Sequence, residues 1–132
     1  MKVVVDTNVL VSGLINPSGN PAQIVGLVLS GKLTVLYDNR IVAEYREVLN
    51  RAKFGFSQEA VGALLDFVAT EGEYVVAQPQ AVKIEQPDDA VFYDVAVSGE
   101  ASYLITGNPK HFPNRSNITT PTEFLRRYRR TL

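Results

Sequence analysis

The sequence predicts an α/β fold in which helices cover a parallel β-sheet. Short runs of β-branched and apolar residues, each of the length of a buried strand, alternate along the chain with segments of helical periodicity. Helices rather than two-residue turns join successive runs, and this alternation is typical of βαβ units. A chain of 132 residues is long enough for one hydrophobic core and too short for two. We therefore expect a single domain over residues 1–132.

The composition excludes several functional classes. The 13 basic and 14 acidic residues give a net charge of −1, so the protein as a whole does not attract nucleic acid or anionic lipid. Either partner would have to bind to a local patch of basic residues. The absence of cysteine excludes disulfides, thiolate metal sites and cysteine nucleophiles. Because the sequence shows neither a run of transmembrane length nor a signal peptide, we expect a soluble, cytoplasmic protein without membrane contact.

The first predicted strand ends in a carboxylate. Val3–Val5 form a β-branched run typical of a strand that is buried on both faces, and Asp6 follows directly. Thr7 and Asn8 come next, with short polar side chains that can cap a helix. Asp6 is thus predicted at the carboxyl end of a central parallel strand, where ligands collect in open α/β sheets.

Four strands and the intervening helices account for most of the chain. The strands are predicted at Val3–Val5, Leu33–Tyr37, Tyr74–Ala77 and Tyr103–Thr106. Polar residues that can cap helices precede the apolar stripes, at Asn20, Asp38, Ser57 and Thr120. The helix after Asp38 is predicted from Asn39 to about Lys53. Asp88 and Asp89 begin another helix, one of them as its cap, and Gly107–Asn117 is a predicted loop.

This topology predicts where the acidic residues meet. In βαβ units the N-termini of helices lie at the same sheet edge as the carboxyl ends of strands. The candidates for this edge are Asp6, Glu44, Asp88, Asp89 and Asn108. Two carboxylates about 5 Å apart repel by roughly 3 kcal/mol at an effective dielectric of about 20, so a cluster needs a cation or displaced pKa values. All-oxygen ligands suit Mg²⁺ or Mn²⁺, and the leading chemistry is metal-dependent phosphodiester hydrolysis.

Three segments of the chain resemble the PIN-domain ribonucleases. They are VVVDTNVLVSGL at Val3–Leu14, VAEYREVL at Val42–Leu49 and PDDAVFYDVAVSGEASYLITGNPKHFP at Pro87–Pro113. The resemblance extends to about Phe124 and points to the VapC-like toxins of bacterial and archaeal toxin–antitoxin pairs. It implies a Rossmann-like α/β/α sandwich with a short parallel sheet, cleavage of single-stranded RNA, and an acidic site for Mg²⁺ or Mn²⁺. It also implies a small antitoxin and a homodimer.

The resemblance gives four positions a role. Asp6, Glu44 and Asp89 match the metal-binding acids, and Asn108 matches a fourth position that is aspartate in many members. Asparagine keeps an oxygen but removes a charge, which would weaken a second metal ion. By themselves, Asp6 is as consistent with a helix cap, and Glu44 is better explained as a residue at the rim of an amphipathic helix.

The acids of the penultimate helix leave an alternative open. Asp88 and Asp89 are also what the helix dipole favours in a first turn. Gln86 stands where relatives often carry another acid, so either aspartate remains a candidate for the primary ligand. Asp94 lies about 140° around the helix from Asp89, and we place it outside the metal-binding set.

Supporting and RNA-binding roles are predicted for the remaining polar residues near the site. Thr7, Asn8 and Thr106 are expected to hold Asp6 and the neighbouring backbone. The basic end of the last helix and the loop after the last strand are more simply explained as solvated surface, with RNA contact as the alternative. The candidates for RNA contact are Lys110, His111, Arg126 and Arg127.

Three functional hypotheses follow. The first is a metal-dependent endoribonuclease, the toxin of a toxin–antitoxin pair. The second, motivated by the neutral Asn108, is a PIN-like module that binds RNA or a protein without cutting. The third is a phosphoacceptor domain, ranked last because such a domain expects a lysine at a later strand tip. Here the last strand ends in Thr106, Gly107 and Asn108, with Lys110 beyond them.

Overall fold

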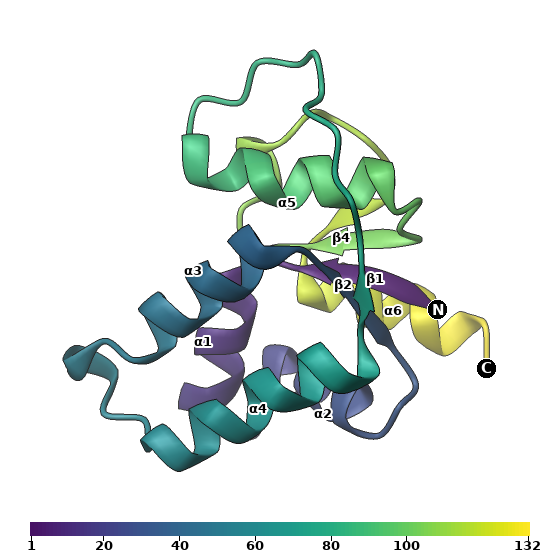
Figure 1. Ribbon diagram of the computed structural model, residues 1–132. Helices are drawn as coiled ribbons and strands as arrows, with labels where there is room; N and C mark the ends of the chain where they lie inside the picture. The colour runs from purple at the N-terminus through teal and green to yellow at the C-terminus, as the bar shows by residue number, and fades with distance from the viewer.

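A five-stranded parallel sheet lies at the centre of the computed structural model, which describes residues 1–132 (Figure 1). The strand order is β3-β2-β1-β4-β5. Each strand pairs in parallel with its neighbours. The strands are β1 (Lys2–Val5), β2 (Thr34–Tyr37), β3 (Glu73–Tyr74), β4 (Tyr103–Ile105) and β5 (Ile118–Thr119). The predicted α/β fold with a parallel sheet is confirmed.

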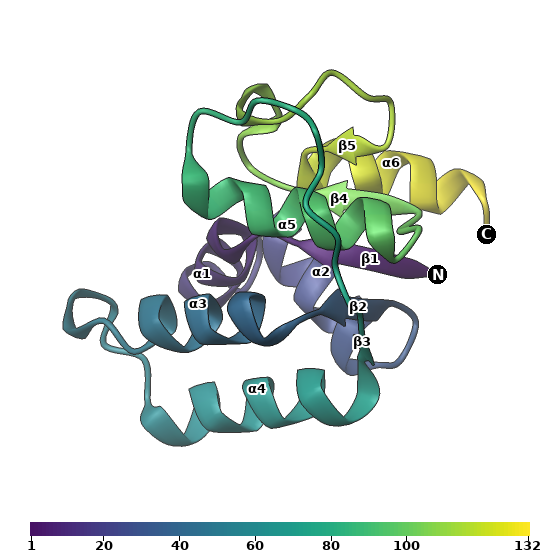
Figure 2. The same ribbon diagram turned by 45° about the horizontal axis from the view of Figure 1, so that its top comes forward.

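Helices form a layer on each face of the sheet. They are α1 (Thr7–Ile15), α2 (Asn20–Leu29), α3 (Asn39–Leu49), α4 (Gln58–Glu71), α5 (Pro87–Ser98) and α6 (Pro121–Arg130), with single 3₁₀ turns η1 (Ala52–Phe54) and η2 (Pro109–His111). Helix α5 covers one face, and α1, α2 and α6 lie on the other (Figures 1 and 2). Helices α3 and α4 run side by side and extend beyond the sheet as an arm, residues 39–71 (Figure 2). No helix is both long and apolar enough to span a membrane.

The core explains why the first strand is the centre of the sheet. Val3, Val4 and Val5 are fully buried. Helix α5 packs on one face of β1, and α1 and α2 lie on the side of the other face (Figures 1 and 2). Strand β1 also has a hydrogen-bonded strand on each side, β2 and β4. The prediction of a strand buried on both faces is therefore confirmed, and Asp6 leaves it at its carboxyl end.

Three of the predicted caps are formed. The Asp38 carboxylate accepts a hydrogen bond from Ile41 N at 3.0 Å, and Ser57 Oγ accepts one from Ala60 N at 2.9 Å. Thr120 Oγ1 accepts from the backbone N–H three residues later at 3.2 Å. These bonds satisfy amide groups that have no partner within the first turn of a helix.

Two predicted caps were wrong. Gly19 rather than Asn20 is the cap residue of α2, and Asn20 instead donates from its side chain to Thr122 Oγ1 at 2.8 Å. Helix α5 begins at Pro87 with Gln86 in the cap position, so neither Asp88 nor Asp89 caps it. The proline fixes the start of the helix one residue before the aspartates, which leaves both carboxylates available for other contacts.

The arm and the sheet edges also differ from the prediction. Helix α3 ends at Leu49, its last buried residue, instead of continuing to about Lys53. The third strand is Glu73–Tyr74 rather than Tyr74–Ala77, because only this part of the chain pairs with β2. A fifth strand, Ile118–Thr119, follows the predicted loop. Two residues are too few to show the alternation by which a strand is recognised in a sequence.

The strand order places a crevice at one end of β1. The chain leaves β1 for β2 and β3 on one side and returns to β4 and β5 on the other. In open α/β sheets, this reversal separates the loops that follow the two neighbouring strands and creates a binding crevice outside their carboxyl ends. The segments that follow β1 and β4 carry Asp6 and Asn108, two of the residues predicted to be functional.

Candidate active site

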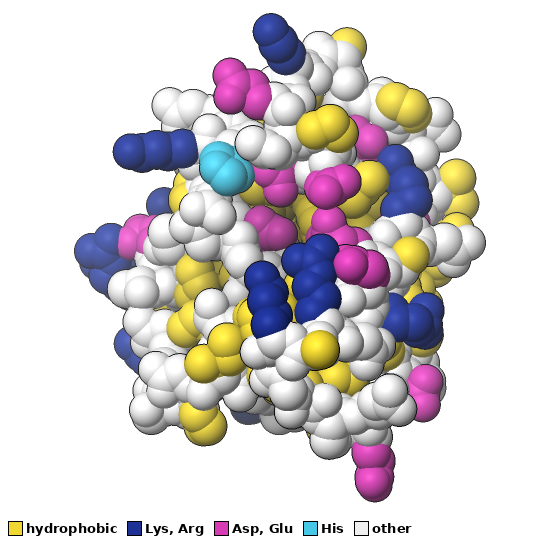
Figure 3. Space-filling view, turned by 90° about the vertical axis from the view of Figure 1, so that its left-hand side faces the viewer, with side chains coloured by type: hydrophobic (Ala, Val, Ile, Leu, Met, Phe, Trp, Pro, Cys, Tyr) yellow, Lys and Arg dark blue, Asp and Glu magenta, His cyan; other side chains and the backbone are white.

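A cleft of about 440 Å³ opens at the carboxyl ends of β1 and β4. Acidic side chains gather in the hollow, the single histidine lies beside them, and basic side chains border it (Figure 3). The lining includes eight of the residues predicted to be functional: Asp6, Thr7, Asn8, Glu44, Asp88, Asp89, Asn108 and His111. These residues come from α1, α3, α5 and the segment after β4, so the predicted convergence at one edge of the sheet is present.

Asp6 is buried and held from two sides. The residue is only 5% exposed. Its Oδ2 accepts hydrogen bonds from Thr106 Oγ1 at 2.7 Å and from Asn8 Nδ2 at 3.1 Å. Although Asp6 occupies the cap position of α1, its carboxylate makes no capping hydrogen bond. The burial is thus not explained by capping, and Oδ1 remains for another ligand.

The residues that hold Asp6 also fix the loop after β4. Thr106 Oγ1 accepts a hydrogen bond from Asn108 N at 3.0 Å while it donates to Asp6. Asn8 Oδ1 accepts from Gly107 N at 3.1 Å, where a Cβ would lie 3.3 Å from the same oxygen. Asn8 and Thr106 therefore connect the ends of β1 and β4, and they orient one carboxylate between them.

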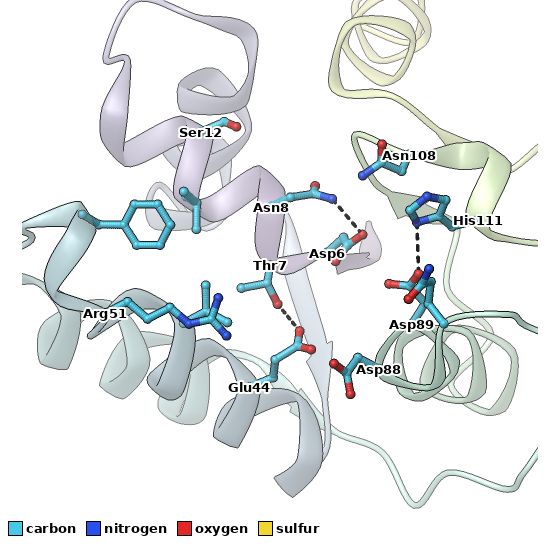
Figure 4. Close-up of a pocket in the computed structure, with 14 residues that line it drawn as sticks. Asp6, Thr7, Asn8, Ser12, Glu44, Arg51, Asp88, Asp89, Asn108 and His111 are labelled. Carbon is cyan, nitrogen blue, oxygen red and sulfur yellow. Dashed lines mark hydrogen bonds and ion pairs between the residues drawn. The ribbon is translucent and has the colours of Figure 1, made fainter.

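Glu44 reaches the cleft from the arm. Its Oε2 accepts a hydrogen bond from Thr7 Oγ1. The neighbouring Tyr45 is fully buried, and its hydroxyl donates to the carbonyl oxygen of Val5, the residue before Asp6. Because Tyr45 connects α3 to the end of β1, Glu44 is held on the same side of the cleft as Thr7 (Figure 4).

The two aspartates of α5 point to different parts of the cleft. Asp89 is half-buried, and its Oδ2 lies 3.2 Å from His111 Nδ1. Asp88 is exposed and lies toward Glu44, whereas Asp89 lies beneath His111 on the Asp6 side (Figure 4). The two neighbours therefore have different surroundings, although the sequence left open which of them is the primary ligand.

The carboxylates raise one another's pKa. Burial is the main cause of the raised pKa of Asp6, and the charge of Asp89 adds to it. Burial also raises the pKa of Glu44, with further contributions from Asp6, Asp88 and Asp89. The pKa of Asp89 is raised by burial and by Asp88, against the lowering effect of His111. The cleft therefore concentrates negative charge that the neighbouring side chains do not fully compensate.

This donor set fits a hard divalent cation by its chemistry. The available ligands are carboxylate and amide oxygens, which Mg²⁺ and Mn²⁺ prefer, and a cation would relieve the repulsion that raises the pKa values. In the present side-chain conformations, no group of three or more His, Asp or Glu residues is arranged to hold a metal ion. The acids surround the cleft without closing on a single point, so binding of an ion requires side-chain rotation.

Several predicted residues lie outside the lining. Thr106 lies beneath it as a fully buried residue, and Lys110 lines a separate hollow. Arg126 and Arg127 both pair with Glu123 on their own helix. Asp94, which the sequence placed outside the metal-binding set, accepts a hydrogen bond from Gln80 N at 3.0 Å and lies near Arg40.

Arg51 and Phe54 are among the lining residues that were not predicted to be functional. Both belong to the turn after α3. The sequence had placed Arg51 in a helix that continues to about Lys53, and Phe54 lies just beyond that predicted end. A signal for them exists in the sequence, since two basic residues directly precede two phenylalanines in Arg-Ala-Lys-Phe-Gly-Phe from Arg51 to Phe56. Basic and aromatic side chains placed close together are typical of surfaces that bind single-stranded nucleic acid.

Comparison with known proteins gives one match. A family model described as PIN domain matches residues 2–110. Neither a curated protein nor a solved structure matches the chain. The matched stretch begins in β1 and ends within η2. It therefore contains the strand ends and helix starts that supply the acidic residues of the cleft.

Proposed function

The chain belongs to the PIN-domain family, whose members are generally nucleases, and on that premise we propose that it is a metal-dependent endoribonuclease that cleaves single-stranded RNA. The observation that carries the proposal is the convergence of three carboxylates with raised pKa values, Asp6, Glu44 and Asp89, in one cleft. An RNA phosphate that entered this cleft alone would be repelled, so the proposal includes a divalent cation.

The protein side of the reaction is the positioning of ligands. Asp6, Glu44 and Asp89 would hold Mg²⁺ or Mn²⁺, and the bound ion supplies charge for the phosphate oxygens and lowers the pKa of water. Asn8 and Thr106 occupy one oxygen of Asp6 and direct the other oxygen away from them. Thr7 does the same for Glu44. Two of the three carboxylates thus have one oxygen held by a neighbouring side chain.

Asn108 and His111 complete the cleft on the β4 side. The Asn108 side chain makes no hydrogen bond within the protein, and its backbone N–H is fixed by Thr106. Its amide can orient a water molecule or a phosphate oxygen without adding to the negative charge. His111 contacts Asp89 through Nδ1. We propose that it positions this acid and contacts the substrate at the rim of the cleft.

The proposal is tested by exchange of the most buried acid. Asp6→Asn keeps the size of the side chain and removes its charge, and we expect cleavage of single-stranded RNA in Mn²⁺ to fall at least roughly 100-fold, since loss of a residue behind a metal ligand already costs 10–100-fold. The matched control is Asp66→Asn on the exposed face of α4, which should leave the rate unchanged. Full activity of Asp6→Asn with an unchanged melting curve would contradict the assignment.

A module that binds RNA or protein without cutting is the second candidate. The neutral Asn108 and the absence of a closed group of ligands favour it. Titration calorimetry with MnCl₂ separates the two candidates, because the nuclease requires binding of the ion at millimolar or lower concentration. A folded wild-type protein that shows no heat of binding in this range supports the second candidate.

The finer biological role is also a proposal. We propose a cytoplasmic toxin whose activity is blocked by a small antitoxin that covers the acidic cleft, and a homodimer as the assembled state. The cleft is open at the carboxyl edge of the sheet, so an inserted peptide with a basic side chain would meet the charges of Asp6, Glu44 and Asp89 directly. Loss of cleavage on co-expression with such a partner, and recovery after its removal, tests this role.

A further inference from the structure

The cleft has a second wall that carries no carboxylate of its own. It is formed by residues 51–56, Arg-Ala-Lys-Phe-Gly-Phe, which we call the aromatic turn. Arg51 and Phe54 from this turn line the same cleft as the acids. Together with Val11 and Val48, Phe54 forms the apolar part of the lining. The nuclease chemistry proposed above uses none of these residues.

Phe54 is held at the cleft although it does not belong to the core. Its ring stacks on Phe56 with centroids 5.5 Å apart and planes 12° from parallel. Phe56 packs against the hydrophobic core, whereas Phe54 is not among the residues that do so. Large aromatic side chains that lie outside the core and face a polar cleft are typical of binding surfaces. Stacking on Phe56 gives the partly buried ring of Phe54 a fixed orientation at the cleft.

Gly55 permits this arrangement. Its φ is +66°, in the left-handed region that residues with a Cβ rarely adopt. A Cβ at this position would meet no atom within 4 Å, so backbone conformation and not space requires the glycine. The reversal at Gly55 ends η1 and brings the rings of Phe54 and Phe56 together.

Two cations accompany the aromatic ring. Lys53 Nζ lies 5.1 Å from the centroid of Phe54. Arg51 is fixed by Glu47, which accepts from Nε at 3.2 Å and from Nη2 at 2.8 Å, so Nη1 makes no hydrogen bond within the protein. The guanidinium points into the cleft toward Glu44 (Figure 4). An aromatic face flanked by positive charge is complementary to a nucleobase with its phosphate.

We propose that the aromatic turn is a nucleotide-binding subsite in which Phe54 stacks on an unpaired nucleobase while Arg51 and Lys53 contact an adjacent phosphate. This inference rests on the proposed nuclease function and specifies its substrate. A base within a duplex is already stacked on both faces and is not available to Phe54, so the subsite selects single-stranded or looped RNA. The acidic residues are the site of phosphodiester cleavage. The aromatic turn determines whether single-stranded or duplex RNA reaches them.

The test measures affinity and stacking separately in the full-length chain. A single-stranded RNA carries a fluorescein end label for anisotropy and 2-aminopurine at one internal position, moved along the strand in successive oligonucleotides. Ca²⁺ replaces Mg²⁺ and Mn²⁺ to retard cleavage. We expect Phe54→Ala to bind about tenfold more weakly, the scale of one base–aromatic stack, and to lose the 2-aminopurine quenching that the wild type shows at one position.

Matched variants identify the role of the ring. Phe54→Leu keeps apolar volume without an aromatic face and should behave like Phe54→Ala, whereas Phe54→Trp should retain both affinity and quenching. The control is Tyr74→Ala on β3, a 51% exposed aromatic residue outside the cleft lining, which should change neither. Thermal melting verifies that each variant is folded. If the smaller side chains unfold the turn, Phe54→Trp is the variant that tests the proposal.

The possible results also separate the two proposals. If the wild type cleaves RNA and Phe54→Leu binds as tightly with the same quenching, the subsite is overturned while the nuclease function stands. If the wild type neither cleaves nor binds RNA, the proposed function fails and the subsite with it. A Phe54→Leu variant with unchanged RNA affinity but altered sedimentation would instead identify the turn as a protein interface, and would also overturn the subsite.

Discussion

The cleft has an acidic wall, formed by Asp6, Glu44 and Asp89, and an aromatic wall, formed by the aromatic turn. The contacts that hold the two walls differ in how far apart their partners lie in the sequence. On the acidic wall, Asp6 is bound by Thr106, which lies 100 residues away along the chain. On the aromatic wall, Arg51 pairs with Glu47 four residues earlier, and Phe54 stacks on Phe56. The position of the acids therefore depends on the whole sheet, whereas the aromatic turn is organised by its own neighbours. The two walls can thus be changed independently.

The largest effect is expected from the pair of adjacent acids on α5. Asp89→Asn should lower RNA cleavage at least roughly 100-fold, because Asp89 is half-buried and points to the Asp6 side of the cleft. Asp88→Asn should lower it less than about fivefold, since an exposed charge contributes about 1 kcal/mol or less. Cleavage rates at saturating Mn²⁺ measure both, and the reverse order would assign the ligand role to Asp88.

A smaller effect, on stability, is expected from the uncompensated charge of the acidic wall. An acid whose pKa is higher in the folded than in the unfolded chain binds more protons when folded. Its contribution to stability therefore falls as the pH rises from the unfolded pKa, about 3.9 for aspartate, through the folded pKa. Without metal, Asp6→Asn should melt a few degrees higher than the wild type at about pH 7.5, and the difference should shrink toward pH 4.

Divalent cations provide the control for this pH dependence. Mn²⁺ at about pH 7.5 should raise the melting temperature of the wild type, because an ion that binds only the folded state stabilises it by mass action. The same addition should have little effect on Asp6→Asn. Equal melting temperatures of the two proteins at every pH would show that the burial of Asp6 is balanced by its hydrogen bonds to Asn8 and Thr106.

The smallest effect is expected on the aromatic wall. Gly55→Ala places a Cβ on a residue with φ of +66° and should cost about 1 kcal/mol of stability. Gly26→Ala is the matched control, because Gly26 lies within α2, where a Cβ also meets no atom within 4 Å and alanine favours the helix. Denaturant unfolding measures both. A cost at Gly26 and none at Gly55 would contradict the role given to the turn.

The sequence predicted the acidic wall better than the aromatic one. A run of three valines that ends in Asp6 indicates a buried strand and its carboxyl end, and the positions of Asp89 and Asn108 follow from the βαβ topology. Glu44 is less predictable from physical reasoning alone, because a glutamate at the edge of an amphipathic helix is common. Its proximity to Asp6 depends on a tertiary hydrogen bond, the one that Tyr45 makes to β1.

The aromatic wall was missed because its geometry contradicts the local pattern. No glycine or proline stops the predicted helix between Leu49 and Lys53, and only the tertiary structure shows that residues 50–53 have no core to pack against. Strand β5 was missed for a different reason, since Ile118–Thr119 is defined by its pairing with β4 and not by its own composition. Elements that depend on a partner far along the chain give no local signal.

The span of the acidic cleft has a consequence for the synthesis of the protein. Asp6 is made near the beginning of the chain, but the residues that hold it and face it come from α3, α5 and the segment after β4, as far as His111. While the chain is still growing, β1 lacks its neighbour β4, and Asp6 lacks its bond from Thr106. The cleft to which we assign RNA cleavage is therefore complete only after most of the chain has been translated.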